Sequence, residues 1–262
     1  MRGRFLFAGG SGVVGQQAVR AFRERHPDLS ILIGGRDVRK AAAFAEDVGN
    51  AEAVTIDTSQ ARLGLSERTS LSAVVMMVPD VGLHGLRLAQ DRQIPYLSIG
   101  NWLVEVGAEM AYFINRPHAS PIVLSSHWHG GPTIFLALAA AKGFDVVHSI
   151  KVGAIVDDQD PTGPVAIEDM ESGAEGASVI LAFQGGRRVW LTGEAAARSF
   201  AAIDGRHFEA QAFAPYDIVS LQAATGAQDV RFDLASGVSS SRLRGGDVAA
   251  ELIVEIDGLV HG

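Results

Sequence analysis

Four glycines stand close together near the N-terminus, directly after the short apolar run 5–8. They fit the pattern G-x-G-x-x-G when counted from Gly10, or a wider variant when counted from Gly9. A diphosphate must approach bare backbone at such a turn, and the helix that follows supplies free N–H groups and partial positive charge. The pattern predicts a dinucleotide site, although a degenerate fold could keep the turn for packing alone. The contacts predicted here are those of Gly9, Gly10, Ser11, Gly12, Val13, Val14 and Gly15.

The end of the next strand carries Gly34, Gly35 and Arg36, where an NAD-dependent enzyme would place a carboxylate for the ribose hydroxyl. A carboxylate would repel a 2′-phosphate, whereas a guanidinium would bind it. The segment therefore predicts contacts from Gly35 and Arg36, and it favours NADP, with NAD as the alternative. Arg39 and Lys40 add positive charge nearby, and a solvated surface cluster would contain the same residues.

Two histidines in the sequence His-Trp-His-Gly-Gly-Pro are the candidate acid–base residues. His127 and His129 lie between a strand and a helix, where an imidazole can exchange a proton near neutral pH. Alternatively, the glycines shape a turn and the histidines satisfy backbone groups. Asp80, just after a strand, is a third catalytic candidate that would bind an amine, or else it caps a helix. His-x-His also resembles a metal site, but no third ligand has suitable spacing, so we predict no metal.

Other chemistries are excluded by missing residues. The chain has no cysteine, which removes disulfides, thiolate metal sites and thiol nucleophiles. No tyrosine is followed four residues later by lysine, so the catalytic pair of short-chain dehydrogenases is absent. The segment 239–244, with three serines, Arg242 and Arg244, could bind a carboxylate or simply connect two elements.

Apolar periodicity predicts an α/β fold with two domains. In residues 1–125, strands alternate with helices in about six units, which is typical of a doubly wound parallel Rossmann sheet. In residues 126–262, a helical stretch precedes mostly strand-like runs, which predicts a smaller, sheet-rich α+β domain for substrate binding and dimerisation. The predicted strands are 5–8, 31–33, 54–57, 73–78, 96–99, 122–124, 146–156, 178–183, 189–191, 230–234 and 252–256. The predicted helices are 13–25, 37–48, one through Leu83 and Leu88, 104–113 and 132–142.

Composition bounds the partners. The chain has 262 residues, a net charge of −8 and 47% hydrophobic residues, which is typical of a soluble globular protein with small-molecule partners. The charge argues against nucleic acid, and no apolar run is long enough for a membrane span or a signal peptide, so a cytoplasmic protein is expected. The apolar runs 178–183 and 252–256 predict a sheet surface that a second copy covers, and hence a homodimer.

Taken in order, the segments FLFAGGSGVVGQQAVRAF, ILIGGRDVRKAAAFAEDVG, AVTIDTSQ and SAVVMMVPD resemble the N-terminal half of the saccharopine dehydrogenase-like family. The resemblance covers about the first 125 residues. It implies an NAD(P)-dependent oxidoreductase in which Gly9, Gly12 and Gly15 lie on the turn and Arg36 on the adenosine side. It also implies that Asp57 lies near the adenine, and that Val78 and Pro79 lie beside the ribose and nicotinamide.

The chain departs from that family in two ways. The fourth strand ends in Met76, Met77 and Val78 rather than in a sequence with asparagine, and the chain stops at Gly262, where family members usually return to the first domain. The sequence predicts an NADP-dependent enzyme that transfers hydride to or from a C=N or C=O bond of a small amino-acid-like substrate. A non-catalytic NADP-binding sensor or partner protein is the alternative.

Overall fold

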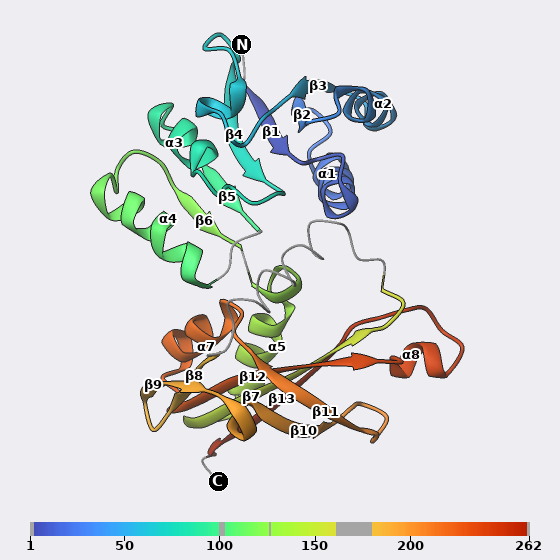
Figure 1. Cartoon of the computed structure of the whole chain (residues 1–262), viewed down its shortest axis with the longest axis vertical. Helices are drawn as coiled ribbons and strands as arrows, with labels where there is room; N and C mark the ends of the chain where they lie inside the picture. Colours follow the sequence, from blue (N-terminus) through green and yellow to red (C-terminus); the bar gives the residue numbers. More distant parts are fainter. Residues whose placement is uncertain (1–2, 100–102, 126, 161–179, 261–262) are drawn as a thin grey trace. The chain divides into compact units, whose positions relative to one another are not determined.

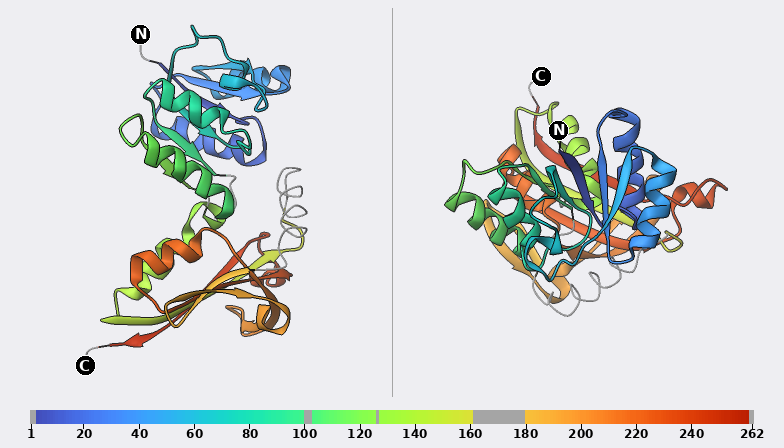
Figure 2. Two further views of the ribbon diagram at one scale, coloured as in Figure 1. Left: turned by 60° about the vertical axis from the view of Figure 1, so that its left-hand side comes forward. Right: turned by 90° about the horizontal axis from the view of Figure 1, so that it is seen from above.

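The computed structural model describes residues 3–99, 103–125, 127–160 and 180–260. The chain divides into two compact units, Met1–Ser126 and His127–Gly262 (Figures 1 and 2). Each unit has its own sheet and its own apolar core. No helix among the described residues is both long enough and apolar enough to cross a bilayer.

The first unit is a six-stranded parallel sheet with helices on both faces. Its strands are β1 (Arg4–Ala8), β2 (Ile31–Gly35), β3 (Ala51–Thr55), β4 (Leu71–Met76), β5 (Tyr96–Ser98) and β6 (Ile122–Leu124). Its helices are α1 (Val13–Arg25), α2 (Val38–Val48), α3 (His84–Asp91) and α4 (Leu103–Asn115), with a 3-10 turn η1 (Ala61–Gly64). The strand order β3-β2-β1-β4-β5-β6 is that of the doubly wound dinucleotide-binding fold, so the predicted fold class is confirmed.

Alternation along β1 assigns its side chains to two cores. Phe7 packs with Val19 of α1 and with Phe44 of α2 on one face, whereas Leu6 packs with Leu86 of α3 on the other. In Figure 1, α1 and α2 accordingly lie on one side of the sheet, and α3 and α4 lie on the other. Because the strands run parallel, their carboxyl ends meet at one edge, and the glycine turn follows β1 at that edge.

The second unit contains a mixed seven-stranded sheet. Its strands are β7 (Val146–Asp157), β8 (Ile180–Gln184), β9 (Arg187–Leu191), β10 (Ala197–Ala201), β11 (His207–Phe213), β12 (Asp229–Gly237) and β13 (Glu251–Leu259). Its helices are α5 (Pro132–Ala141), α7 (Asp217–Thr225) and α8 (Ser240–Leu243), with 3-10 turns η2 (Trp128–Gly130) and η3 (Gly193–Ala196). The main strand order is β10-β11-β12-β7-β13, and β8 pairs with both β12 and β9. Among the described strands of this second sheet, only the β12–β7 pair is parallel.

Helices cover one face of this sheet, and on the other face side chains of the sheet's own strands pack together. Helices α5 and α7 pack on Ile150, Val152 and Phe232, which alternate toward them along β7 and β12. On the opposite face, Phe200 of β10 lies over Gly153, where an added Cβ would stand 2.6 Å from the ring. Glycine at position 153 therefore makes room for the aromatic side chain.

Several sequence-based element assignments differ from the structure. The third strand covers residues 51–55 instead of 54–57, and the fourth covers 71–76 instead of 73–78. Strands β10 and β11 and helices α7 and α8 were not predicted. The start of the predicted run 178–183 lies outside the described residues.

The physical reason given for a homodimer needs correction. Leu181 and Ala182 of β8 are buried within the second unit, and Leu252, Val254 and Ile256 of β13 pack against its helix-covered core. The chain itself therefore covers much of the apolar surface that was expected to need a partner. The homodimer stays a prediction, for which the edge position of β13 is the remaining argument.

Candidate functional site

Packing inside the first unit accounts for three of the four glycines in the turn after β1. Gly9 has φ +82° and would place a Cβ 2.5 Å from Val78 Cγ1. A Cβ on Gly10 would stand 2.9 Å from Phe7 Cβ, and one on Gly15 would stand 2.3 Å from the carbonyl oxygen of Gly9. These positions need glycine because the turn, β1 and α1 approach each other closely.

Packing inside the unit gives little reason for a glycine at the fourth position, Gly12. Gly12 has φ −76° and ψ 177°, which any residue can adopt, and its Cβ would meet only the Gly9 carbonyl oxygen, at 3.2 Å. Helix α1 begins there without a side-chain cap, so the N–H groups of its first turn are available to an anion. Val13 and Val14 are 48% and 57% exposed at the same helix end. The arrangement leaves a bare, donor-rich surface of the kind that a diphosphate requires.

The turn is held rigidly from its sides. Ser11 is buried, and its carbonyl oxygen accepts a hydrogen bond of 3.0 Å from the side chain of Gln16. A Cβ added to Gly35, at the end of β2, would lie 3.4 Å from Ser11 Oγ. The structure thus brings Ser11 and Gly35 together, as a site spanning the first two strands requires.

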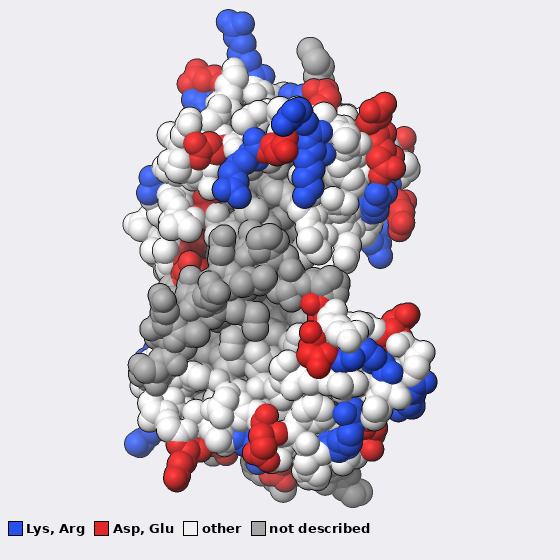
Figure 3. Space-filling view, turned by 45° about the vertical axis from the view of Figure 1, so that its right-hand side comes forward, with Lys and Arg blue, Asp and Glu red and all other residues white. Residues whose placement is uncertain are grey.

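A basic group follows β2. Arg36, Arg39 and Lys40 are exposed, and none of them pairs with an acidic side chain within the described residues. Asp37 instead caps α2, because its Oδ1 accepts the backbone N–H groups of Arg39 and Lys40 at 3.0 and 3.3 Å. In Figure 3, Lys and Arg side chains lie among Asp and Glu side chains on the surface of this unit. Because Arg36, Arg39 and Lys40 are exposed, they are available to an anionic ligand.

Asp57 and the end of β4 complete the predicted cofactor set. The Asp57 carboxylate accepts hydrogen bonds from the Ser59 hydroxyl at 2.6 Å, from its N–H at 2.9 Å and from the Gln60 amide at 2.8 Å. These bonds, led by the Ser59 hydroxyl, hold the pKa of Asp57 below its ordinary value. Val78 packs against Gly9, and Pro79 follows it, so both lie just after β4.

Asp80 makes the contacts of a helix cap. Its carboxylate oxygens accept the backbone N–H groups of Gly85 and Leu86 in the first turn of α3, at 3.2 and 3.0 Å. The Tyr96 hydroxyl donates to the same carboxylate at 3.1 Å, and Asp80 is only 3% exposed. Burial and the nearby carboxylates raise the pKa of Tyr96 above its ordinary value. These contacts match the capping interpretation of Asp80.

Replacing Asp80 by alanine should lower the free energy of unfolding by about 2–3 kcal/mol, because three buried donors lose their acceptor. Urea denaturation followed by circular dichroism measures the loss. Asp91→Ala is the control, since Asp91 forms an exposed pair with Arg116 that contributes less than about 1 kcal/mol. Equal losses in both variants would contradict the capping role.

The two histidines have different surroundings in the second unit. His127 Nε2 lies 2.9 Å from the Ser220 hydroxyl, and its ring packs against Tyr216 with centroids 5.0 Å apart. His129 is exposed, has φ +49° and stacks on Trp128 with centroids 4.7 Å apart. Its ring makes no hydrogen bond within the part of the chain that the structure describes. The segment follows β6 and precedes α5 in the chain, as predicted.

Asp217 is a buried carboxylate that the sequence did not mark. It is 0% exposed at the start of α7, and its Oδ2 accepts the Trp128 N–H at 2.7 Å. Its Oδ1 has no hydrogen-bond partner among the described residues. Burial raises the pKa of Asp217, and the Trp128 N–H and the nearby His127 partly oppose this shift.

The raised pKa of Asp217 predicts a pH-dependent stability. Below the unfolded pKa of about 4 the carboxyl is protonated in both states, and above the folded pKa only the folded state bears the cost of a buried charge. Stability from this group is therefore lost as pH rises through the folded pKa. Asp217→Asn should remove that loss, so its Tm relative to wild type should increase as pH rises. Asp247→Asn, at an exposed position, should show no such trend.

Side chains of the serine-rich segment before Gly245 form contacts inside the second unit. Arg242 Nε lies 3.0 Å from Asp157 Oδ2, and its guanidinium also contacts Asp158. The Arg242 guanidinium holds the pKa of the buried Asp157 well below its usual range. The Ser240 hydroxyl likewise donates to buried Glu251 at 3.0 Å. Arg242 is thus paired, while Arg244 remains exposed.

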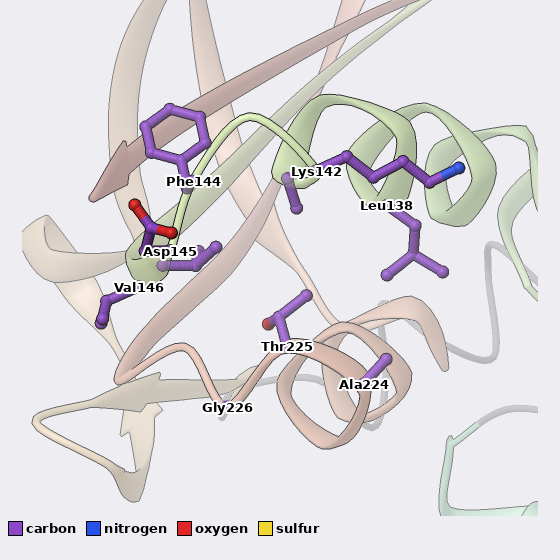
Figure 4. Close-up of a pocket in the computed structure, with 10 residues that line it drawn as sticks. Leu138, Lys142, Phe144, Asp145, Val146, Ala224, Thr225 and Gly226 are labelled. Carbon is purple, nitrogen blue, oxygen red and sulfur yellow. The ribbon is translucent and has the colours of Figure 1, made fainter. Parts of the chain in front are cut away.

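Two hollows lack the features of a dinucleotide site. A groove of about 380 Å³ on the α1 side of the first sheet is lined by apolar side chains, including Phe5, Phe22 and Met77. A second, also of about 380 Å³, lies between the ends of α5 and α7 (Figure 4). There Lys142 points away from Thr225, and both Lys142 and Asp145 are exposed. Within the described residues, no group of three or more His, Asp or Glu side chains could hold a metal ion.

No protein-family model matches the sequence, and the comparison with curated proteins gives no match. Solved structures do share its fold. Saccharopine dehydrogenase (L-Glu forming) from Saccharomyces cerevisiae aligns with a TM-score of 0.56 and 12% identity, over 89% of this chain and 55% of its own. A myo-inositol dehydrogenase from Corynebacterium glutamicum aligns with a TM-score of 0.52 and 13% identity, over 98% of this chain and 73% of its own.

A third structure was solved with a dinucleotide. The WlbA (WbpB) dehydrogenase from Thermus thermophilus, in complex with NAD and UDP-GlcNAcA, has a TM-score of 0.50 and 10% identity, over 99% of this chain and 84% of its own. The chain spans about half the length of the yeast enzyme. At these identities the likenesses show that the chain shares the fold of NAD(P)-binding oxidoreductases.

Proposed function

We propose that this chain is an NADP-dependent oxidoreductase of the saccharopine dehydrogenase-like type. It would transfer hydride to or from a C=N or C=O bond of a small, amino-acid-like molecule. The observation that carries the proposal is the N-terminus of α1, where Gly12 leaves bare backbone that packing inside the chain does not require. The fold shared with three dehydrogenases, one of them solved with NAD, supports the same cofactor class.

The residues present fit a dinucleotide. The first turn of α1 and Gly12 would hold the pyrophosphate, since free N–H groups and bare backbone meet there. Arg36 would bind the 2′-phosphate of NADP, because its guanidinium is exposed and unpaired within the described residues, and Gly35 places no carboxylate beside it. Val78 and Pro79 would lie beside the ribose and nicotinamide by the family resemblance.

The bound nicotinamide would supply or accept the hydride. The side chains of this protein would then provide orientation and a proton. The glycine turn is rigid because Gln16 holds Ser11 and because Gly9 packs on Val78, so the cofactor meets a preformed surface. A histidine of the segment 127–132 would donate the proton that accompanies reduction, or accept it in the reverse direction.

Two measurements on the purified chain test the proposal. Nicotinamide fluorescence should show saturable NADPH binding, tighter than that of NADH. Nicotinamide absorbance should then fall when NADPH is mixed with members of a panel of keto acids, each with and without amines. Binding without turnover of any member would favour the non-catalytic NADP-binding alternative, and absence of binding would reject both proposals.

A further inference from the structure

Two residues at and near the start of α7 contact the His127 side chain. Ser220 lies one helical turn after Tyr216, so both side chains face the same direction. The Ser220 hydroxyl lies 2.9 Å from His127 Nε2, and the Tyr216 ring packs against the imidazole. Ser220 is 93 residues away in the chain, so tertiary structure alone brings it to His127.

The same helix also fixes the backbone next to His127. Asp217 is fully buried and accepts the Trp128 N–H at 2.7 Å. The Trp128 ring packs against Phe213 and Phe232, with centroids 5.5 and 5.6 Å away. His127 is thereby anchored through its ring and through the peptide that follows it, which is the preorganisation that an acid–base group requires.

His129 lacks this support. Its ring stacks on Trp128 and is exposed, with no hydrogen bond to orient either ring nitrogen among the described residues. In known acid–base sites, a second group hydrogen-bonds one nitrogen of the imidazole and leaves the other to exchange the proton. Only His127 of the two has such a partner in the described structure.

We propose that His127, rather than His129, is the acid–base residue, and that Ser220 and Asp217 are its positioning residues. The inference rests on the proposed oxidoreductase function. In the reducing direction, the substrate carbon receives a hydride and its oxygen or nitrogen receives a proton from the His127 imidazolium. The imidazole is left neutral and regains a proton from water, so the step is balanced. In the oxidising direction, neutral His127 takes the proton from the substrate.

Among the described residues, the titratable groups that interact with this imidazole are Asp217, at the start of α7, and Tyr216, just before it. His129, two residues along the segment, stacks on Trp128. Asp160 contributes an electrostatic interaction with His129. Ser220 does not titrate in the accessible pH range, so its removal alters the tautomer and orientation of His127 without removing a charge.

The first arm of the test needs no turnover. Histidine labelled with ¹⁵N in the full chain reports the tautomer and titration of each ring, and His127→Gln assigns the His127 signals. We expect Ser220→Ala to change the tautomer balance of His127, Ser220→Thr to preserve it, and Ser199→Ala, at an exposed position, to leave it unchanged. Unaltered His127 signals in Ser220→Ala would overturn the positioning role.

The second arm measures kcat, its pH profile and NADPH affinity. We expect His127→Gln to lower kcat on the order of a hundredfold and Ser220→Ala on the order of tenfold, with NADPH affinity unchanged. Asp217→Asn should lower kcat less than Asp217→Ala does, because the amide oxygen of asparagine can still accept the Trp128 N–H and alanine cannot. The control variant His148→Gln alters an exposed histidine of β7 and should behave as wild type.

The outcomes separate the two proposals. Loss of activity in His129→Gln but not in His127→Gln would overturn the assignment of His127. Wild-type protein that binds NADPH but turns over no substrate would overturn the oxidoreductase function and with it the catalytic role of His127. In that case the labelled histidines still decide whether Ser220 and α7 fix the imidazole.

Discussion

Replacing Gly12 by valine is expected to weaken NADPH binding by roughly a hundredfold or more while leaving the first unit folded. The backbone at Gly12 suits any residue, and the new Cβ would approach only the Gly9 carbonyl oxygen, at 3.2 Å. The Gly9 carbonyl group must shift slightly to accept this Cβ, which costs folding less than the 2.3 Å approach at Gly15 would. Two additional methyl groups would nevertheless lie over the N–H groups that receive the pyrophosphate, and they would displace it. Fluorescence titration gives the affinity, and circular dichroism gives the fold.

Two other glycines serve as controls for this experiment. Gly107→Val adds the same side chain on α4, where nothing lies within 4 Å, so affinity should match that of wild type. Gly15→Ala should destabilise the unit, because its Cβ would stand 2.3 Å from the Gly9 carbonyl oxygen. A folded Gly12→Val protein that binds NADPH as tightly as wild type would reject the assignment of the turn to the pyrophosphate.

The first unit was predictable because buried parallel strands have continuous apolar sequences. The helix 13–25 and the strand 122–124 have the predicted bounds. The third strand was displaced because Ala51, Glu52 and Ala53 have weak strand propensity, and they form a strand only as the edge partner of β2. In the second unit, β10 and β11 were not predicted, because they alternate polar and apolar residues in short runs and contain no continuous apolar segment.

The part of the site that is formed by one continuous segment could be predicted from the sequence, whereas the part formed by long-range contacts could not. The glycine turn is one continuous segment, so its spacing alone carries the prediction. Asp217 and Ser220 act on residues about 90 positions earlier in the chain, and no spacing rule connects them. The only local signal was an aspartate at the start of an apolar helical run, which is typical of a helix N-terminus and does not indicate a partner.

Cofactor selectivity should reside at the end of β2. A guanidinium hydrogen-bonded to the 2′-phosphate contributes roughly 1.5–3 kcal/mol, because the contact is charge-assisted. Arg36→Ala should therefore weaken NADPH binding by about ten- to a hundredfold. NADH lacks the phosphate, so its affinity should change little. Isothermal titration of both cofactors against wild type and variant gives the ratio of NADPH affinity to NADH affinity, which is the quantity that Arg36→Ala should lower.

Gly35→Asp should shift the same ratio by repulsion. Gly35 does not have a positive φ, and the atom nearest to a Cβ added there is Ser11 Oγ, at 3.4 Å. Aspartate therefore fits at this position without backbone strain. Its carboxylate would repel a 2′-phosphate and could accept the ribose hydroxyl of NADH, so NADPH should bind more weakly and NADH more tightly.

Arg39→Ala is the matched control for Arg36, because it removes an equal charge three residues further along the chain, in the first turn of α2. Equal NADPH losses in Arg36→Ala and Arg39→Ala would show a diffuse electrostatic effect, and equal losses of both cofactors in Arg36→Ala would show that this side chain supports the loop or the adenine instead.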